Sequence, residues 1–186
     1  MFNLRRAEAL RYPFTLGKKR KDLRRENNKA KKILILGVGN ILLRDEGLGV
    51  RVVEKIIKEH PLSENVEVID GGTLGLRLIP YLEGRDAVFI IDAVDMGREP
   101  GELFRIESHG IDDIYNERKL SAHQIGLREV LALSRLQQIL PQKVLLFGIQ
   151  PKTVDIGLDL SEPVSSRLDE LIKMLLDEVQ SLALAY

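Results

Sequence analysis

Short apolar runs alternate with helix-like segments over most of the chain, and this alternation restricts the fold more than any other feature of the sequence. The runs at 33–38, 87–91 and 143–149 are almost continuously apolar. Strands that are buried on both faces and separated by helices are typical of a parallel sheet covered by helices. We therefore expect an α/β fold, a three-layer sandwich with a mostly parallel, twisted central sheet and helices on both faces.

The segments between these runs predict the remaining elements. Residues 46–60 carry apolar side chains at helical spacing and are followed by Pro61, so they are predicted to form a helix that crosses back over the sheet. A helix over 121–140 is predicted to have Ser121 as its N-cap. The other predicted elements are strands at 66–69 and 101–107 and helices at 74–82 and 162–184.

Composition narrows the class of protein. A chain of 186 residues with 44% hydrophobic content is long enough to form one globular domain with a sizeable core. The chain contains no cysteine, which excludes disulfides, zinc-thiolate sites and iron–sulfur clusters. No apolar run is long enough to span a membrane. We therefore expect a soluble, cytoplasmic protein, and the sequence leaves its oligomeric state open.

Charge divides the chain into two parts. Residues 1–32 contain 12 Lys or Arg against 3 Asp or Glu, whereas residues 33–186 contain 16 basic and 25 acidic residues. We predict a basic N-terminal extension at 1–31, flexible or partly helical, and a single α/β domain at 32–186. A solubilising or expression tail is favoured over contact with nucleic acid or a membrane, and folding onto the acidic body or another subunit is a further alternative.

The loop that follows the first strand begins like a nucleotide-binding loop and ends in two acids. Gly37 and Gly39 occupy the first two glycine positions of a dinucleotide fingerprint, but Leu42 stands where the third glycine is needed. Asp45 and Glu46 then follow where a phosphate would rest. Carboxylates repel a phosphate and attract a cation. The loop therefore favours a cation over a nucleotide.

Further polar residues follow the other predicted strands. Asp70 and Asp92 end the second and third strands, and His123 stands at the start of a later helix. Ligands of open α/β sheets bind outside the carboxyl ends of the strands, so these side chains are expected near Asp45 and Glu46. A mixed set of carboxylates and an imidazole fits Zn, Ni, Mn or Fe better than Ca or Mg.

Each of these residues also has a structural interpretation. An acid in the first helical turn is favoured by the helix dipole, and this interpretation is preferred for Asp45. Asp70 and Asp92 can serve as turn residues that bind nearby backbone N–H groups. His123 can pack at the helix start. The other histidines are interpreted as capping or turn residues: His60 and His109.

Four stretches, in this order and spacing, resemble one known family. They are residues 35–50, Asp70-Gly71-Gly72-Thr73 with Gly75, Ile91-Asp92-Ala93, and Ser121-Ala122-His123-Gln124-Ile125-Gly126-Leu127. They resemble the hydrogenase maturation proteases, which trim the large subunit of nickel-iron hydrogenases. Residues 148–151 and 157–161 resemble the family's last strand and the lead into its C-terminal helix. Residues 1–30 have no counterpart in the family pattern.

The resemblance implies a site and a substrate. Glu46, Asp92 and His123 match the family's metal-contacting and catalytic positions, while Asp70 and Gln124 are candidates for supporting or substrate-positioning roles. The implied metal is nickel carried by the substrate, with another divalent metal able to occupy the site in vitro. The implied partner is a hydrogenase large-subunit precursor that already holds its nickel-iron centre and loses a C-terminal peptide. An incomplete set of three ligands suits a metal whose other ligands come from the substrate.

The hydrolytic step has no familiar nucleophile. The chain lacks cysteine, a Gly-x-Ser-x-Gly elbow and a His-Glu-x-x-His helix. Our hypothesis is that nickel polarises the scissile carbonyl or activates a bound water, with Asp92 or Glu46 accepting a proton. Three alternatives stay open: a Rossmann-like nucleotide-binding enzyme, a peptidase of the same fold with another target, and a non-catalytic module that docks through the basic extension.

Overall fold

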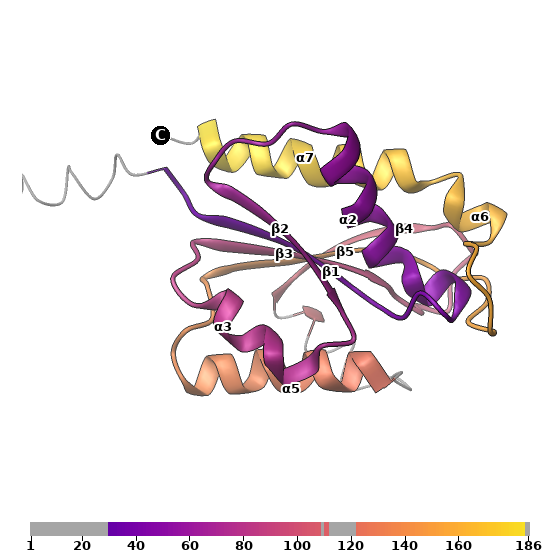
Figure 1. Ribbon diagram of the computed structural model, residues 1–186, viewed down its shortest axis with the longest axis horizontal. Coiled ribbons are helices and arrows are strands. Elements are labelled where there is room, and N and C mark those ends of the chain that lie inside the picture. The colour runs from indigo at the N-terminus through magenta and orange to yellow at the C-terminus, as the bar shows by residue number, and fades with distance from the viewer. Residues whose placement is uncertain (1–29, 109, 112–121, 185–186) are drawn as a thin grey trace, which may run out of the picture. The chain divides into compact units, whose positions relative to one another are not determined.

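Five strands form one sheet at the centre of the structure. The computed structural model describes residues 30–108, 110–111 and 122–184, with side chains described except at 122–123 and 183–184. The strands are β1 (Ile33–Val38), β2 (Val66–Gly72), β3 (Ala87–Ala93), β4 (Leu103–Glu107) and β5 (Lys143–Ile149). Their spatial order is β2-β1-β3-β5-β4, and only β4, at one edge, runs antiparallel to its neighbour (Figure 1).

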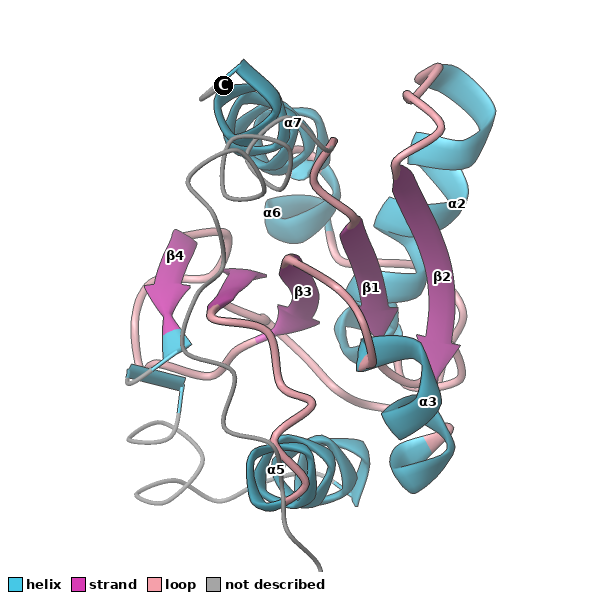
Figure 2. Ribbon diagram, turned by 90° about the vertical axis from the view of Figure 1, so that its left-hand side faces the viewer, coloured by secondary structure: helices cyan, strands magenta, loops and turns pink. Residues whose placement is uncertain are grey.

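Helices cover both faces of the sheet, as Figure 2 shows. One face carries α2 (Leu48–Glu59), α6 (Glu162–Ser165) and α7 (Leu168–Leu184). The other carries the 3-10 turn η2 (Gly75–Leu78), α3 (Ile79–Leu82) and α5 (Ala122–Leu136). The expected three-layer sandwich with a mostly parallel sheet is therefore confirmed.

Successive side chains of each central strand enter opposite cores. In β1, Ile33 and Ile35 pack toward α2 and α7, whereas Leu34 and Leu36 pack toward α3 and α5. All four are essentially inaccessible to water, and each such burial contributes about 1.5–3 kcal/mol. Strands buried on both faces explain why the sequence shows continuous apolar runs there.

A pair of glycines sets how closely α2 approaches the sheet. A Cβ on Gly49 would lie 2.2 Å from the carbonyl oxygen of Ile91 and 2.3 Å from that of Val38. A Cβ on Gly37 would lie 2.2 Å from the carbonyl oxygen of Gly49. Because these neighbours are backbone atoms, no larger residue fits without moving the helix. The two glycines thus bring the start of α2, and the turn before it, against the carboxyl edge of the sheet.

Several predicted boundaries needed correction. The helix expected at 46–60 is divided into a 3-10 turn, η1 (Arg44–Gly47), and α2. The helix expected to reach residue 140 ends at Leu136, because Gln138 adopts a left-handed conformation with a φ of 59°. The helix expected at 162–184 is two helices, α6 and α7.

The predicted strands at 33–38 and 143–149 agree with β1 and β5, while β2 and β3 extend beyond their predicted ends. Ser121, the predicted N-cap of α5, lies outside the described residues. The predicted boundary between extension and domain stays a prediction. In the part of the chain that the structure describes, no helix has the length and apolar character that a membrane crossing requires.

Candidate active site

Glu46 stands on the turn η1, where β1 passes into α2. Its side chain is only 7% exposed and lines a pocket of about 590 Å³. The backbone of Glu46 is held in place, since the amide of Asn40 donates a hydrogen bond to its carbonyl oxygen at 3.2 Å. Gly39 has a φ of 135°, and a Cβ there would lie 1.9 Å from that oxygen. Glycine at 39 is therefore required to close the loop over Glu46.

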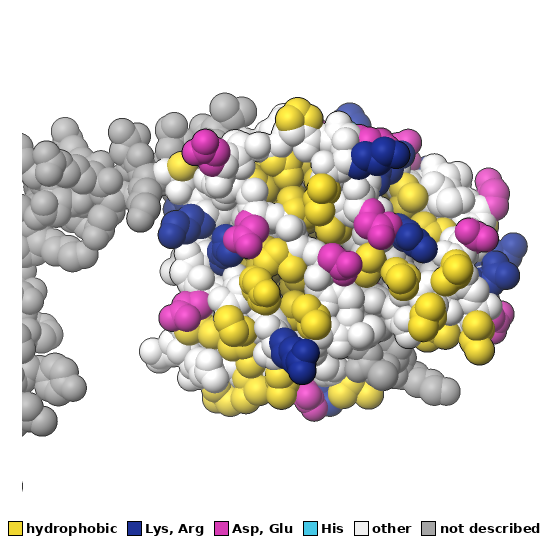
Figure 3. Space-filling view, in the orientation of Figure 1, with side chains coloured by type: hydrophobic (Ala, Val, Ile, Leu, Met, Phe, Trp, Pro, Cys, Tyr) yellow, Lys and Arg dark blue, Asp and Glu magenta, His cyan; other side chains and the backbone are white. Residues whose placement is uncertain are grey.

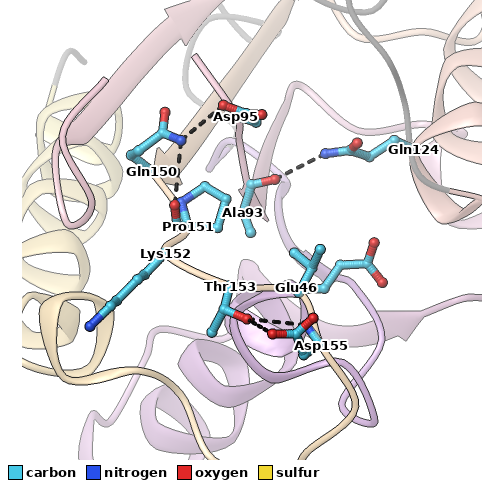
Figure 4. A pocket seen from close by; sticks show the side chains of 10 residues that line it. Glu46, Ala93, Asp95, Gln124, Gln150, Pro151, Lys152, Thr153 and Asp155 are labelled. Carbon is cyan, nitrogen blue, oxygen red and sulfur yellow. Dashed lines mark hydrogen bonds between the residues drawn. The ribbon is translucent and has the colours of Figure 1, made fainter. Parts of the chain in front are cut away.

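The pocket lies between η1, the start of α5 and the loops that follow β3 and β5. Figure 4 shows its lining side chains. Three of the lining residues are acids and one, Lys152, is a cation whose side chain points away from the others. The pocket therefore favours a cationic or electropositive group over an anion. The lining residues are Glu46, Ala93, Asp95, Gln124, Gln150, Pro151, Lys152, Thr153, Val154 and Asp155.

Asp92 is joined to this pocket through Gln124. The Asp92 side chain is fully buried at the carboxyl end of β3. The Gln124 amide nitrogen donates hydrogen bonds to Asp92 Oδ2 at 3.1 Å and to the carbonyl oxygen of Ala93 at 2.9 Å. Ala93 and Gln124 both line the pocket, so Asp92 sits directly behind its wall. Glu46 and Asp92, far apart in sequence, thus approach the same pocket.

His123 precedes Gln124 in the first turn of α5, but its side chain lies outside the described part of the chain. Among the side chains that are described, no three His, Cys, Asp or Glu residues form a group able to hold a metal ion. That finding does not include His123. The metal set of Glu46, Asp92 and His123 therefore stays a prediction.

Asp45 has a larger structural role than the helix-dipole interpretation gave it. It does lie in the first turn of η1, but its fully buried carboxylate also anchors the loop after β5. It accepts hydrogen bonds from the backbone amides of Lys152, Thr153 and Ser161 at 2.8, 3.0 and 2.7 Å. The Ser161 hydroxyl donates a fourth at 2.8 Å. Asp45 thereby fixes one wall of the pocket.

Gln150 fixes another wall and was not singled out from the sequence. Its Oε1 accepts hydrogen bonds from the amides of Met96 at 2.7 Å and Arg98 at 3.2 Å. Its Nε2 donates to Asp95 Oδ1 at 2.9 Å. Its signals were its position directly after β5, where ligands bind, and its place in the stretch 148–151 that resembles the family.

Of the remaining predicted residues, Asp70 and His60 are not part of the pocket lining. Asp70 is exposed near the end of β2, paired in register with Gly37, so it reaches the expected edge of the sheet without entering the pocket. His60 is the C-cap of α2, as predicted. His109 lies outside the described residues. The turn η1, with its two acids, occupies the place where a dinucleotide would put its pyrophosphate, so the geometry gives no support to the nucleotide-binding alternative.

Comparisons with known proteins agree on one family. The sequence model of the hydrogenase maturation proteases matches residues 50–178. Hydrogenase expression/formation protein HupD of Rhodobacter capsulatus is 38% identical over 154 residues, which cover 82% of this chain and 73% of that protein. Hydrogenase 2 maturation protease of Escherichia coli K12 is 35% identical over 146 residues, which cover 78% of this chain and 88% of that one.

Solved structures show the same likeness. The hydrogenase maturating endopeptidase HybD from E. coli superposes with a TM-score of 0.77 and 33% identity, covering 81% of this chain and 93% of that one. The [NiFe] hydrogenase maturation protease HybD from Thermococcus kodakarensis gives a TM-score of 0.67 and 26% identity, covering 79% and 98%.

Proposed function

The chain belongs to the hydrogenase maturation protease family. We propose that it is an endopeptidase that removes the C-terminal extension of a nickel-iron hydrogenase large-subunit precursor. The observation that supports this most is the acid-lined pocket at the carboxyl edge of the sheet, with Glu46 in its lining and Asp92 behind its wall. Both are carboxylates that burial holds in one geometry, as a site for catalysis requires.

The finer part of the proposal concerns nickel. Glu46, Asp92 and His123 contact nickel that belongs to the substrate, so that only a precursor already loaded with its metal completes the site. Two carboxylates and one imidazole leave positions open for ligands from the substrate. The acidic lining of the pocket and the buried Asp92 behind it support this, because a metal cation gains more from buried carboxylates than from the same groups in water.

The hydrolysis follows from these roles. Water attacks the carbonyl carbon of the scissile peptide bond, the C–N bond breaks, and the leaving amine takes up a proton. Nickel in the substrate polarises the carbonyl or lowers the pKa of the attacking water. Glu46 or Asp92 accepts the proton from that water and passes it to the amine. Gln124 holds the Asp92 carboxylate, and Asp45 and Gln150 hold the surrounding loops.

The test uses purified protein with a hydrogenase large-subunit precursor, with and without nickel, and measures tail removal by mass spectrometry. We expect cleavage only of the nickel-loaded precursor, and a large loss of rate in Glu46→Gln, Asp92→Asn and His123→Ala. Glu64→Gln, an exposed acid outside the pocket, is the matched control. Nickel-independent cleavage would contradict the role of the metal, and wild-type rates in all three variants would remove the proposed site.

A further inference from the structure

Exposed apolar side chains gather around the C-terminal ends of the parallel strands, where the candidate active site lies. In the described part of the chain, eleven large hydrophobic side chains are exposed, and eight of them belong to loops or helix starts at this edge. Figure 3 shows yellow side chains gathered at the right-hand end, over the loop between β5 and α6. We call these eight the apolar rim: Ile41, Leu42, Leu74, Leu76, Ile125, Val154, Ile156 and Leu158.

The loops after β1 and β5 form one part of the rim. The amide of Gly157 donates to the carbonyl oxygen of Leu42 at 2.9 Å, and the amide of Arg44 donates to that of Gly157 at 2.9 Å. These bonds pair the two loops in parallel, with a bridge between Leu43 and Gly157. Leu42 therefore stands beside the segment that carries Ile156, whose side chain is 88% exposed.

The end of β2 and the start of α5 continue the rim. The amide of Gly39 donates to the carbonyl oxygen of Gly72 at 3.0 Å, which joins the loop after β1 to the end of β2. A Cβ on Gly126 would lie 3.3 Å from the Cα of Gly75, so the first turns of α5 rest against η2. The elements that carry the rim residues thus follow one another from the first loop to the end of β2, η2 and α5, and Val154 places the rim at the border of the pocket.

The rim is held outward by a fixed framework. The Asp45 carboxylate binds the loop after β5 at both of its ends, and the Asn40 Oδ1 accepts the amide of Leu42 at 3.0 Å. Chains of this size carry scattered exposed apolar residues, but a contiguous group at one edge marks a surface that another molecule covers. Fixed loops also lower the entropy lost when a partner binds.

We propose that the apolar rim is the docking surface for the precursor protein, which packs apolar side chains on the rim while its metal centre enters the acid-lined pocket. This inference rests on the proposed function and assigns substrate binding and the reaction to two different parts of the surface. The rim supplies affinity, and the pocket supplies chemistry. The geometry favours this occupant, because a substrate whose metal centre enters the acid-lined pocket must also lie against the rim that borders it, whereas a second copy of this chain would bring acid against acid.

The test replaces three rim residues that do not line the pocket, in the variant Leu42→Ser, Ile156→Ser, Leu158→Ser. Its control carries Ile57→Ser and Leu136→Ser, which are exposed apolar residues on α2 and at the far end of α5. With nickel-loaded precursor we expect KM to rise about 10- to 100-fold in the triple variant, with kcat within about 2-fold of wild type. In the control variant, KM and kcat should equal those of the wild type. Because all five side chains are exposed, both proteins should fold, which circular dichroism verifies, and Ile156→Ser alone should raise KM in the same direction.

Three results would overturn the proposal that the precursor docks on the apolar rim. One is an unchanged KM in the triple variant while the wild type cleaves, which leaves the proposed function standing. Another is a fall in kcat with KM unchanged. A third is a dimer of the wild-type chain in analytical ultracentrifugation that the triple variant abolishes with no change in KM, which would assign the rim to a second copy. If the wild type cleaves no precursor, the proposed function fails. Ultracentrifugation then tests the docking proposal by itself, by comparing how the precursor binds to the wild type and to the triple variant.

Discussion

Gln124 joins two sides of the candidate active site through one side-chain amide. Its nitrogen binds both the carboxylate of Asp92 and the backbone oxygen of Ala93, so the start of α5 and the end of β3 are held in one arrangement. If Asp92 takes part in the reaction as proposed, Gln124 acts through it, by fixing where the carboxylate points. Its loss should change the chemical step more than substrate binding.

We therefore expect Gln124→Met to lower kcat by about 10- to 100-fold with KM within about 2-fold, the range seen when a supporting hydrogen bond at a metal site is removed. Steady-state cleavage of nickel-loaded precursor measures both constants. Gln137→Met is the matched control, because Gln137 is exposed beyond the other end of α5. A rise in KM with unchanged kcat would show that Gln124 binds substrate instead.

Asp45 carries a stability role at the same scale. Its carboxylate accepts four hydrogen bonds while fully buried. In Asp45→Asn an NH₂ group replaces one carboxylate oxygen, and because NH₂ cannot accept hydrogen bonds, some of these donors lose their partner. We therefore expect the free energy of unfolding to fall by about 2–4 kcal/mol. Urea denaturation measures the loss, and Asp159→Asn, on the exposed part of the same loop, should be neutral. Equal stability of Asp45→Asn and wild type would mean that the loop does not depend on this anchor.

At the scale of elements, the contact between α2 and the sheet depends on glycine. A Cβ at Gly49 meets two backbone oxygens at 2.3 Å or less, so Gly49→Ala must displace α2 and with it Glu46. We expect the free energy of unfolding to fall by about 3 kcal/mol or more, as measured by thermal or urea unfolding. Gly126→Ala in α5, where the nearest atom is 3.3 Å away, is the matched comparison and should change stability by no more than about 1 kcal/mol. Similar effects of the two substitutions would contradict the close contact.

A second link between elements ties α7 to the sheet. Glu178 on α7 binds Arg105 on β4 and Lys143 at the start of β5. Burial raises the pKa of Glu178, but the hydrogen bonds and charges of Lys143 and Arg105 lower it more, so its pKa lies below the ordinary value of 4.5. A carboxylate with a lowered pKa stabilises the fold above pH 4.5 and loses that contribution as the pH falls through its folded-state pKa.

Glu178→Gln should therefore lower the free energy of unfolding by about 1 kcal/mol at pH 7. The effect is small because Arg105 and Lys143 are about one third exposed, so solvent screens their ion pairs with Glu178. The difference from wild type should shrink as the pH falls below 4.5. Urea unfolding at several pH values measures it. Asp177→Asn, an exposed pair partner of Lys173 on the same helix, is the control and should cost less. A difference that stays constant down to pH 3 would rule out the ionised carboxylate as its source.

The elements also show what local sequence could and could not predict. Continuous apolar runs predicted β1 and β5 residue for residue, because burial on both faces leaves little room for polar side chains. The end of α5 was missed, since Gln138 adopts a left-handed conformation without being glycine. The anchoring roles of Asp45 and Gln150 were missed for another reason. Asp45 binds residues more than 100 positions away and Gln150 binds residues more than 50 away, and local patterns carry no trace of such partners.

Glu46 and Asp92 could be expected near one another because they stand at or beyond the ends of recognisable parallel strands, and the family resemblance then selected them as site residues. Their approach to one pocket depends on Gln124, which entered the prediction only through the family resemblance. The apolar rim was not predicted at all. Exposure of a side chain such as Ile156 is a property of the folded loops and their hydrogen bonds, and an apolar residue in the sequence gives no sign of it.

At the scale of the whole molecule, the acidic body holds the entire described core. Both core clusters, with the residues packed against them, come from positions between Ile33 and Leu182. Residues 1–29 contain 10 basic and 3 acidic residues, so removing them leaves a chain with 18 basic and 25 acidic residues. The truncated chain is more acidic, yet it keeps every described core contact. One deletion should thus change the net charge while it leaves the described core in place.

We expect a chain that begins at residue 30 to melt within about 2 °C of the 186-residue chain, because the described core lies entirely between Ile33 and Leu182. If the precursor docks on the apolar rim, the truncated chain should also cleave it with unchanged KM, and that KM should vary little between about 50 and 300 mM salt, since apolar contacts are not screened. Differential scanning calorimetry and cleavage assays measure the two expectations. A KM that rises on truncation and loses its salt dependence would instead place docking on the basic extension, because contacts made by charges weaken as salt is added.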